Sequence, residues 1–390
     1  MRNKLKPYLS LYIHWPFCES KCPYCDFNSH VRSEIDQERW KKALLSELAT
    51  ECNLYPDRRI SSLFFGGGTP SLMKPDTITA LLQAVDQYWG LENNVEITLE
   101  ANPNSVEKTQ FKNFRTAGIN RLSIGAQSFD DKALKFLGRT HTAREVIAAL
   151  DIARSTFSRY SFDLIYCRPQ QSMDTWKKEL TSALEFTNDH LSLYQLTIER
   201  GTPFFASHRD KKFKMPNEDT AAEQYEYTRD ILSRAGLFPY EVSNHATPGG
   251  ECRHNLTYWR YGDFAGIGPG AHGRVSDNGQ KIAYRRISNP EKWLLQTEKT
   301  GTGLQKKHKL APKEILQEMV LMGLRLTEGL DLHEVKKQTG NSIEYWFDPD
   351  NLMLLIEENL LVLTENKLQA TQEGLLRLDS INSLLLTKLA

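Results

Sequence analysis

Short runs of β-branched, aromatic and leucine residues alternate with longer segments of helical periodicity through the first two hundred residues. Runs of this composition are typical of β-strands. They span residues 10–14, 61–65, 95–99, 121–125, 160–166 and 191–197. Strands that alternate with helices predict a parallel sheet, because each helix returns the chain to the edge from which the next strand starts.

The segments between these strands carry the apolar stripes of amphipathic helices. Two stripes consist of Trp40, Leu44, Leu45 and Leu48, and of Ile78, Leu81, Leu82 and Val85. Pro75 suits a first helical turn, and Gly118 suits a C-terminal stop. Thr142 and Glu145 have the spacing of a capping box. Six strand–helix units predict an α/β fold with a partial (β/α)6 barrel, since two further units for a closed barrel are not apparent.

The rest of the chain differs from this repeat. Residues 201–303 are rich in Gly, Pro and aromatic residues, which predicts an irregular α+β extension over a site. Residues 304–390 open on a basic patch, followed by helices at 315–326 and 350–361, a hairpin at 361–364 and 367–371, and a last helix. The basic patch consists of Lys306, Lys307, His308 and Lys309. We therefore predict three domains, with a small winged-helix-like helical domain at the C-terminus.

Composition excludes several classes of protein. The 390 residues include 49 Lys and Arg and 49 Asp and Glu, so no net field draws the chain to nucleic acid or to an anionic membrane. Because the basic patch is short and the recognition element is not visibly basic, we expect the winged-helix-like domain to be a packing or interaction module and not a DNA-binding one. No apolar run approaches a membrane span, and the N-terminal Arg2, Lys4 and Lys6 are not followed by the apolar core of a secretory signal. These features predict a cytoplasmic protein.

Three of the six cysteines lie within eight residues, and this spacing is the sharpest chemical signal. Cys18, Cys22 and Cys25 follow the end of the first predicted strand, where sites are built in parallel α/β folds. Close thiolates repel one another unless a metal holds them, and cysteine sulfur holds [4Fe–4S] cubes. Three ligands leave one of the four irons open to a small molecule. The pattern predicts a catalytic type of cluster.

Two other interpretations of these cysteines remain open. A zinc ion could be bound with His14 or His30 as the fourth ligand, although no second Cys/His pair is present. The thiols could also be buried and inert. Cys52 and Cys167 have no role that the sequence indicates.

The motif Cys-x-x-x-Cys-x-x-Cys at the end of a first strand resembles that of the radical S-adenosylmethionine family. The resemblance implies that the open iron binds the amino and carboxylate groups of S-adenosylmethionine, and that an electron donor reduces the cluster. Residues 64–70, Phe-Phe-Gly-Gly-Gly-Thr-Pro, resemble the glycine motif of this family, and glycines let a backbone approach a ligand closely. They lack the Gly-Lys-Ser/Thr ending of a phosphate-binding loop.

Further strand ends resemble the coproporphyrinogen-oxidase-like branch of this family. The segments are Leu-Glu-Ala-Asn-Pro at 99–103, Gly-Ala-Gln-Ser-Phe at 125–129 and Asp-Leu-Ile-Tyr at 163–166. Taken alone, each polar residue in these segments could be a solvated surface charge or a paired structural carboxylate. The resemblance implies that S-adenosylmethionine is bound by Tyr12, Tyr24, Gly67, Gly68, Thr69, Glu100, Gln127, Arg139 and Asp163. One departure is Cys167-Arg168-Pro169, where the branch usually has Gly-Leu-Pro.

Within this branch, the chain is more similar to heme chaperones than to the oxygen-independent oxidases. The oxidases have another cysteine at the position of Phe27 and a longer segment before the cluster motif than the 17 residues here. The segment His254-Asn-x-x-Tyr258-Trp259 is the heme-chaperone signature. A neutral imidazole is a good axial ligand, and the two aromatic rings offer flat area for a porphyrin. His254 is thus the predicted heme ligand, and His272 is the second choice. The other interpretation of His254 is a buried histidine whose hydrogen bonds are made to the backbone.

Three functional hypotheses follow. The favoured one is a heme chaperone that passes heme to an unidentified acceptor protein, which could be membrane-associated. The second is a radical enzyme that decarboxylates coproporphyrinogen III, with propionates recognised by Arg253, Arg260, Arg274 and Arg285. The third is a DNA-binding regulator with a cluster as its sensor, which the neutral charge disfavours.

Overall fold

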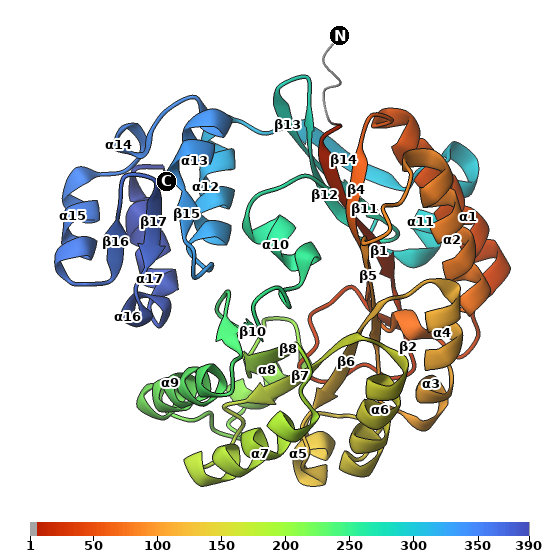
Figure 1. The fold of residues 1–390 in the computed structure, drawn as a ribbon, viewed down its shortest axis with the longest axis horizontal. Helices are drawn as coiled ribbons and strands as arrows, with labels where there is room; N and C mark the ends of the chain where they lie inside the picture. The colour runs from red at the N-terminus through yellow and green to blue at the C-terminus, as the bar shows by residue number, and fades with distance from the viewer. Residues whose placement is uncertain (1–5, 390) are drawn as a thin grey trace.

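The computed structural model describes residues 6–389, and residues 1–5, part of the segment in which no secretory signal was predicted, lie outside the described chain. Six parallel strands form the centre of one twelve-stranded sheet, as the sequence predicted (Figure 1). They are β1 (Tyr8–Trp15), β4 (Arg59–Gly67), β5 (Glu96–Ala101), β6 (Arg121–Gln127), β7 (Arg159–Tyr166) and β8 (His190–Gln195). Each of these strands pairs in parallel with the next.

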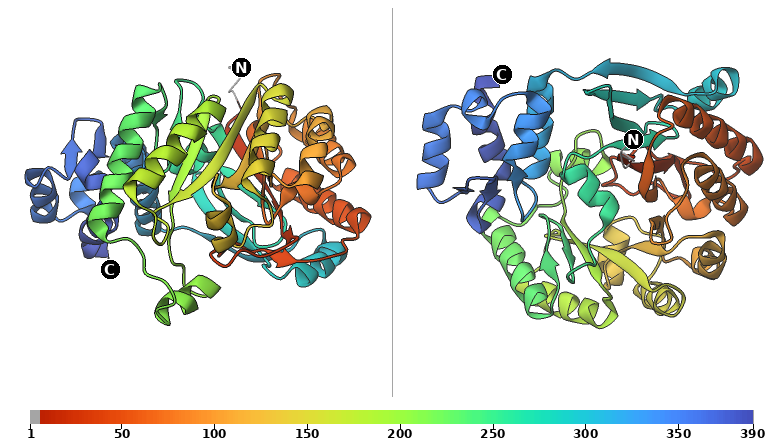
Figure 2. Two further views of the ribbon diagram at one scale, coloured as in Figure 1. Left: turned by 90° about the horizontal axis from the view of Figure 1, so that it is seen from below. Right: turned by 45° about the horizontal axis from the view of Figure 1, so that its top comes forward.

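Helices between these strands cover the outer face of the curved sheet (Figure 2). They are α1 (Gln37–Leu54), α2 (Pro75–Trp89), α3 (Ser105–Thr109), α4 (Phe111–Ala117), α5 (Asp131–Phe136), α6 (Ala143–Thr156) and α7 (Met173–Phe186). The predicted end signals are confirmed. Thr142 and Glu145 form a capping box, and Gly118 ends α4 with a left-handed backbone at φ 115°.

Alternation along the strands separates an apolar outer face from a polar interior. In β6, the buried Leu122, Ile124 and Ala126 pack in the core beneath the helices, whereas Arg121 and Ser123 line a cavity inside the barrel. The same period of two places serines, carboxylates and histidines of the other strands on the inner face. The barrel therefore has its core between sheet and helices and a polar lumen in which a site can form.

Residues 201–303 are more regular than their composition predicted, because they extend the sheet at both edges. Beside β1 lie β11 (Phe264–Ile267), β12 (His272–Asp277) and β13 (Gln280–Arg286), and beside β8 lie β10 (Asn244–Ala246) and β9 (Phe238–Pro239). The helices are α8 (Pro203–Arg209), α9 (Glu218–Arg234), α10 (Arg253–Trp259) and α11 (Pro290–Thr300). Glycines serve close strand packing here: a Cβ on Gly266 would lie 2.1 Å from the backbone oxygen of His272.

The basic patch is a strand of the large sheet. Leu304–Lys309 form β14, which pairs with β13 at the edge of this sheet and not with the C-terminal domain to which the patch was assigned. Lysines on an edge strand discourage pairing with other sheets. The patch thus has a structural explanation that needs no nucleic acid.

The C-terminal residues form a separate small domain beside the barrel (Figures 1 and 2). Its helices are α12 (Pro312–Gly323), α13 (Leu332–Thr339), α14 (Ile343–Trp346), α15 (Pro349–Glu357), α16 (Gln372–Leu375) and α17 (Leu378–Leu385). The predicted hairpin is present as β16 (Leu361–Leu363) and β17 (Lys367–Ala370), which β15 (Leu330–Asp331) joins in a three-stranded sheet. This domain has its own apolar core, which includes Leu316, Val320 and Leu368.

Contacts between the two parts include α10 and the residues after it, and the pair of Arg325 with Glu241 at 3.0 Å. Arg260 pairs with Glu328 at 2.7 Å, and Tyr261 is buried in the core of the C-terminal domain. In the described part of the chain, the helices are each too short or too polar to cross a bilayer.

Candidate cofactor site

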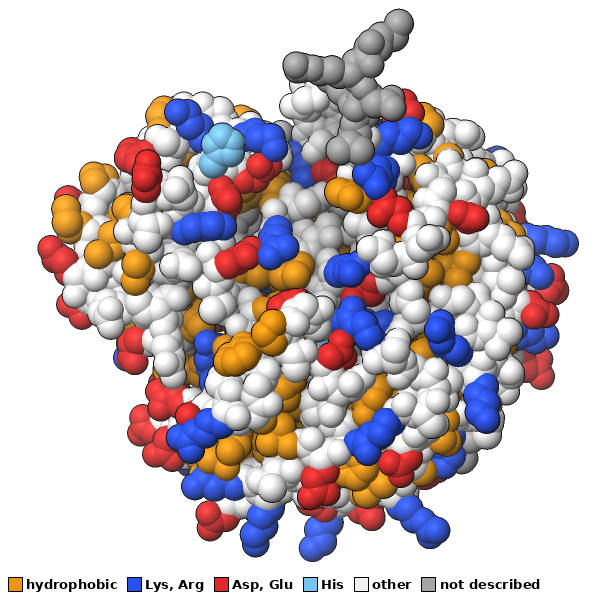
Figure 3. Space-filling model, in the orientation of Figure 1, with side chains coloured by type: hydrophobic (Ala, Val, Ile, Leu, Met, Phe, Trp, Pro, Cys, Tyr) orange, Lys and Arg blue, Asp and Glu red, His pale blue; other side chains and the backbone are white. Residues whose placement is uncertain are grey.

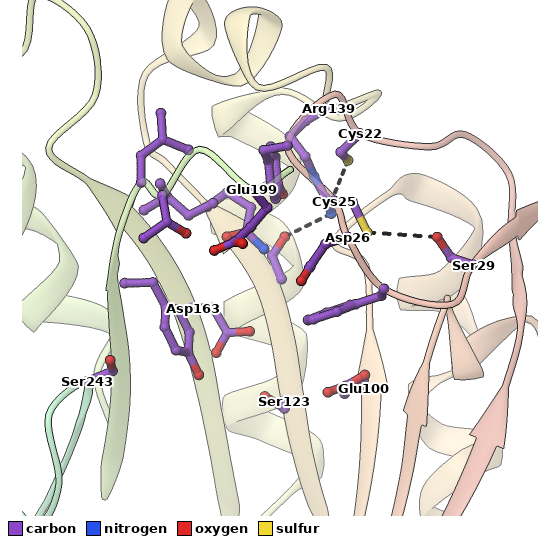
Figure 4. A pocket seen from close by; sticks show the side chains of 18 of the residues that line it. Cys22, Cys25, Asp26, Ser29, Glu100, Ser123, Arg139, Asp163, Glu199 and Ser243 are labelled. Atoms are coloured by element: carbon purple, nitrogen blue, oxygen red, sulfur yellow. Dashed lines mark hydrogen bonds between the residues drawn. The ribbon is translucent and has the colours of Figure 1, made fainter. Parts of the chain in front are cut away.

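Two adjoining cavities occupy the lumen of the barrel. The larger, about 650 Å³, lies at the carboxyl ends of the strands and contains the cysteine loop (Figure 4). The smaller, about 220 Å³, is lined by residues near the strand starts, such as Arg121 and His190. Both cavities are lined by Glu100, Ser123, Asp163 and Tyr194. The site is therefore one polar space with an outer and an inner part.

The cysteine loop is held at the mouth of this space by a short pair of strands. β2 (Phe17–Cys18) pairs with β3 (His30–Val31) and closes the loop between them. Cys18, Cys22 and Cys25 all line the larger cavity. Burial raises the pKa of Cys18, and the nearby thiols of Cys25 and Cys22 raise this pKa further. Three thiols brought together in this way are stabilised as thiolates by a metal.

Each of the three sulfurs lies near one side-chain donor from a different part of the chain. The Thr69 hydroxyl donates to Cys18 Sγ at 3.4 Å, and Arg139 Nη1 donates to Cys22 Sγ at 3.3 Å. The Ser29 hydroxyl lies 3.8 Å from Cys25 Sγ. Hydrogen bonds to cluster ligands orient them and tune the potential of the cluster.

The donor set fits a cluster better than a single zinc ion. Zinc needs four ligands within about 2.3 Å of one point. Among residues 6–389, no three His, Cys, Asp or Glu side chains converge closely enough to hold one ion. His14 Nε2 lies 2.9 Å from the Asn28 backbone oxygen, and His30 Nε2 lies 3.1 Å from Asn28 Oδ1. Neither histidine lines the larger cavity that the three thiols line. A cube, in contrast, binds its cysteines at separate corners.

The glycine run packs against the protein's own chain. Gly67 has φ 119°, and a Cβ there would lie 2.6 Å from His14 Cε1; a Cβ on Gly68 would lie 2.6 Å from the Phe17 oxygen. The backbone amides of Gly68 and Thr69 donate to the oxygens of Trp15 and Phe17. The glycines were expected to let the backbone approach a ligand closely. Here they let it approach the cysteine loop, which brings Thr69 next to Cys18.

Two half-buried carboxylates, Glu100 and Asp163, face each other across the space shared by the cavities (Figure 4). Burial raises the pKa of Glu100 to about 8, and the nearby Asp163 carboxylate makes a smaller contribution in the same direction. Burial raises the pKa of Asp163 to about 6. Glu100 accepts one bond from the Gly67 amide at 3.2 Å. A cationic ligand between these side chains would restore their ionised forms, so the pair suits a sulfonium or an ammonium group.

The structure places eight of the nine residues predicted for S-adenosylmethionine on the wall of the larger cavity. They are Tyr24, Gly67, Gly68, Thr69, Glu100, Gln127, Arg139 and Asp163. Gln127 has a left-handed backbone, φ 66°, and Arg139 donates to the Gly125 oxygen at 3.1 Å. Tyr12 differs, because its side chain lines the inner cavity and its hydroxyl lies 3.1 Å from His14 Nδ1.

His254 lies in the inner cavity with both ring nitrogens in hydrogen bonds. Its side chain is 1% exposed. Nδ1 lies 3.0 Å from Ser62 Oγ, and Nε2 lies 2.6 Å from the Tyr258 hydroxyl. Burial lowers the pKa of His254 to about 3, so the imidazole is neutral. In this conformation neither nitrogen is free for iron, and the bonds come from side chains and not from the backbone.

The two aromatic residues of the same segment point to different places. Tyr258 lines the inner cavity, whereas the Arg325 guanidinium of the C-terminal domain lies 4.7 Å from the centre of the Trp259 ring. They therefore do not form one open porphyrin face here. His272, the second choice of heme ligand, is exposed at the start of β12.

The four arginines considered for propionate recognition lie outside the residues that line either cavity. Arg260 pairs with Glu328, and Arg274 pairs with Glu318 at 2.6 Å. Arg253 donates to the Asn94 oxygen, and Arg285 donates to Gln305. Each of these side chains has a partner within the protein, and the four do not gather as a basic cluster at either cavity.

The departure at Cys167-Arg168-Pro169 is accommodated by packing. Cys167 has φ 55°, a left-handed conformation that explains why glycine suits this position. Arg168 is buried and forms an ion pair with Glu179, and it donates to Ser128 Oγ at 2.6 Å. The turn is thus held by a satisfied network.

Several lining residues were missed by sequence reasoning. Asn102, in the segment Leu-Glu-Ala-Asn-Pro at 99–103, accepts a hydrogen bond from Arg139 and donates to Thr69 Oγ1 at 3.2 Å. Leu375 and Leu376 of the C-terminal domain also line the larger cavity. The motif at 99–103 could have predicted Asn102. No local pattern indicates that a distant domain covers the barrel.

Comparison with known families and proteins identifies relatives of this chain. The family model described as the radical SAM superfamily matches residues 12–182, and that of the HemN C-terminal domain matches residues 310–377. The chain is 36% identical over 392 residues to the heme chaperone HemW of Haemophilus influenzae, covering 99% of both chains. It is 40% identical over 388 residues to the mitochondrial radical S-adenosyl methionine domain-containing protein 1 of Bos taurus, covering 97% of this chain and 88% of the relative.

A solved structure shares the fold. Coproporphyrinogen III oxidase (HemN) from Escherichia coli superposes with a TM-score of 0.82 at 23% identity, covering 98% of this chain and 91% of that chain. At this identity the likeness concerns the architecture alone. The partial barrel and its C-terminal domain, as predicted, are therefore those of a known fold.

Proposed function

Because this chain belongs to the radical SAM superfamily, among the relatives that carry a HemN C-terminal domain, we propose that it is a heme chaperone. The observation that carries the proposal is the full-length likeness to the heme chaperone HemW, at 36% identity over 99% of both chains. Phe27, which stands where the oxidases have a further cysteine, favours the same choice.

The outer cavity is proposed to hold a [4Fe–4S] cluster and S-adenosylmethionine. Cys18, Cys22 and Cys25 would hold three irons. When bound and reduced, this pair supplies a 5′-deoxyadenosyl radical. Glu100 and Asp163 face the space where a cation would lie, and their shifted pKa values suit that role. The remaining contacts are proposed for Tyr24, Gly67, Gly68, Thr69, Gln127 and Arg139, with Tyr12 placed behind them in the inner cavity.

Heme is proposed to bind at the His254 segment. For Nε2 to become a ligand, its hydrogen bond to Tyr258 must break. Because α10 lies between the barrel and the C-terminal domain, opening this segment also loosens the contact of Trp259 with Arg325. His272 is the alternative ligand, since it is already exposed.

The proposed cycle ends with heme transfer to an acceptor protein, and an electron donor would serve the cluster. A cytoplasmic location remains a prediction; the printed name of the bovine relative places that protein in mitochondria.

A heme titration tests the proposal. We expect purified protein to give a Soret band that saturates near one equivalent of heme, and His254→Ala to weaken binding about tenfold or more. His272→Ala is the matched control and leaves the band unchanged. An undiminished band in His254→Ala together with loss in His272→Ala would move the ligand to His272, and no saturable band in the parent protein would end the proposal. Anaerobic turnover of coproporphyrinogen III would instead favour the enzyme.

Iron counting tests the cluster independently. After anaerobic reconstitution, the Ala variants of Cys18, Cys22 and Cys25 are expected to lose most of their iron. Cys52→Ala is the control, because Cys52 packs near the Tyr88 oxygen and away from the loop. Full iron content in the Cys22 variant would contradict the ligand assignment.

A further inference from the structure

One continuous stretch of the C-terminal domain combines acidic charge with exposed apolar side chains. Residues 341–366, which include α14, α15 and β16, contain six Asp and Glu and no Lys or Arg. The whole of residues 310–390 carries thirteen acidic and seven basic residues, although the complete chain is neutral. The excess negative charge is therefore concentrated on this small domain.

The outward face of α15 shows the combination most clearly. Met353 and Leu354 are 59% and 48% exposed, whereas Leu355 faces the domain core. Asp350 and Glu357 are exposed on the same helix, and Glu358 is exposed at its C-cap. Positions three and four apart share a helical face, so the two apolar side chains lie between acidic ones.

The apolar surface continues onto neighbouring elements. Val362 and Leu363 are exposed on β16, which pairs only with β17 and is thus an edge strand, and Tyr345 is exposed on α14. Figure 3 shows hydrophobic and acidic side chains together on the part of the surface that α14 and α15 occupy in Figure 1. We call these five apolar residues and the acidic side chains around them the acidic face; its apolar members are Tyr345, Met353, Leu354, Val362 and Leu363.

We propose that the acidic face docks a partner protein whose contact surface has an apolar centre and a basic rim. Exposed apolar side chains that gather within a polar rim are typical of protein interfaces. The charge selects the partner: the six carboxylates of residues 341–366, a segment without Lys or Arg, would repel an anionic membrane or a nucleic acid, and one basic side chain beside the face, Lys388, donates to the Tyr345 backbone oxygen at 3.5 Å. A basic protein surface gains both electrostatic attraction and apolar burial.

Docking at the acidic face does not require bound heme. The face belongs to the domain whose Leu375 and Leu376 line the larger cavity, so a docked partner would bind the domain that covers the site. If the proposed function holds, the acceptor protein is the natural partner. Binding at the acidic face and binding of heme can nevertheless be measured separately.

The test uses the whole 390-residue chain and a short synthetic peptide of lysine and leucine, with the leucines on one helical face. Fluorescence anisotropy is expected to show saturable binding that weakens as salt increases. The double variant Met353→Ser/Leu354→Ser should bind the peptide about tenfold more weakly, since the apolar centre would be lost. Leu295→Ser is the matched control, because Leu295 on α11 is also 59% exposed, and it should bind like the parent.

A charge variant keeps the test decisive if the apolar variant folds poorly. Glu357→Lys/Glu358→Lys should weaken peptide binding to a similar degree, whereas Glu226→Lys on α9 should not. Equal binding of a peptide of the same composition with its leucines spread around the helix would overturn the proposal, because attraction would then be purely electrostatic. Self-association of the parent protein that the serine variant abolishes would also overturn it, since a second copy would occupy the face.

Discussion

The Tyr258 hydroxyl lies 2.6 Å from Nε2 of His254, so the nitrogen proposed for heme already has a partner. The variant Tyr258→Phe removes that partner and leaves the ring in place. Because a hydrogen bond contributes about 1 kcal/mol, we expect heme to bind this variant roughly fivefold more tightly. Equilibrium titration of the Soret band measures the change.

A double variant controls this experiment. His254→Ala combined with Tyr258→Phe should return heme affinity to the level of His254→Ala alone, because the freed nitrogen is then absent. If Tyr258→Phe binds heme no better than the parent, the bond is structural and His254 is not the ligand.

Ligand binding between Glu100 and Asp163 is expected to release a proton. Both carboxyls have a pKa raised by burial, to about 8 and about 6, so near pH 7 Glu100 is mostly protonated. A cation beside it favours the ionised form, and binding of S-adenosylmethionine should release up to about one proton per ligand near pH 7. Calorimetry in buffers of different ionisation enthalpy measures this number.

The same raised pKa values set the sign of the pH dependence of stability. Each carboxyl holds its proton more tightly when folded than when unfolded, so its contribution to stability is full below the unfolded pKa of about 4. That contribution is lost as the pH rises through about 6 for Asp163 and about 8 for Glu100. Glu100→Gln should flatten this pH dependence at the higher pH values and reduce proton release. Unchanged proton release in this variant would mean that the proton comes from another group.

The sequence predicted the six central strands because their outer positions are uniformly apolar. In β7, Tyr160, Phe162 and Leu164 form a buried row against the helices, whatever the inner positions contain. The polar inner residues, such as Asp163, were recognisable as site candidates because they interrupt a strand whose other face is fully buried. The local alternation of apolar and polar residues therefore predicted both the fold and most of the candidate site residues.

The remaining features depend on contacts that are distant in sequence. Glycine and proline in residues 201–303 indicated irregular structure, although Gly266 serves close packing of β11 against His272 in β12. The state of His254 depends on Ser62, which lies 192 positions away in the chain. Cover of the cavity by Leu375 requires the docking of a second domain. No local pattern contains such information.

The hydrogen bonds to the cysteines predict a change in cluster potential. Ser29→Ala removes the hydroxyl 3.8 Å from Cys25 Sγ, and a lost donor leaves more charge on sulfur. We expect the reduction potential to fall by about 40 mV, the one-electron equivalent of ~1 kcal/mol, with iron content unchanged. Redox titration followed by electron paramagnetic resonance measures the potential. Ser20→Ala, at an exposed position of the same loop, is the control; an equal shift in both variants would mean a general loop effect.

Gly67 is predicted to be required by the protein itself, before any ligand binds. A Cβ at this position would lie 2.6 Å from His14 Cε1 and 2.8 Å from the Trp15 oxygen, on a backbone at φ 119°. Gly67→Ala therefore combines an unfavourable backbone conformation with overlap, and we expect the free energy of unfolding to fall by about 3 kcal/mol. Gly90→Ala separates the two effects, because Gly90 has φ 77° and no atom within 4 Å of the added Cβ, so it should cost about 1 kcal/mol. Denaturant unfolding of the metal-free proteins compares the pair. If Gly67→Ala costs no more than Gly90→Ala while losing cofactor, the glycine serves the ligand and not the packing of β4 on the cysteine loop.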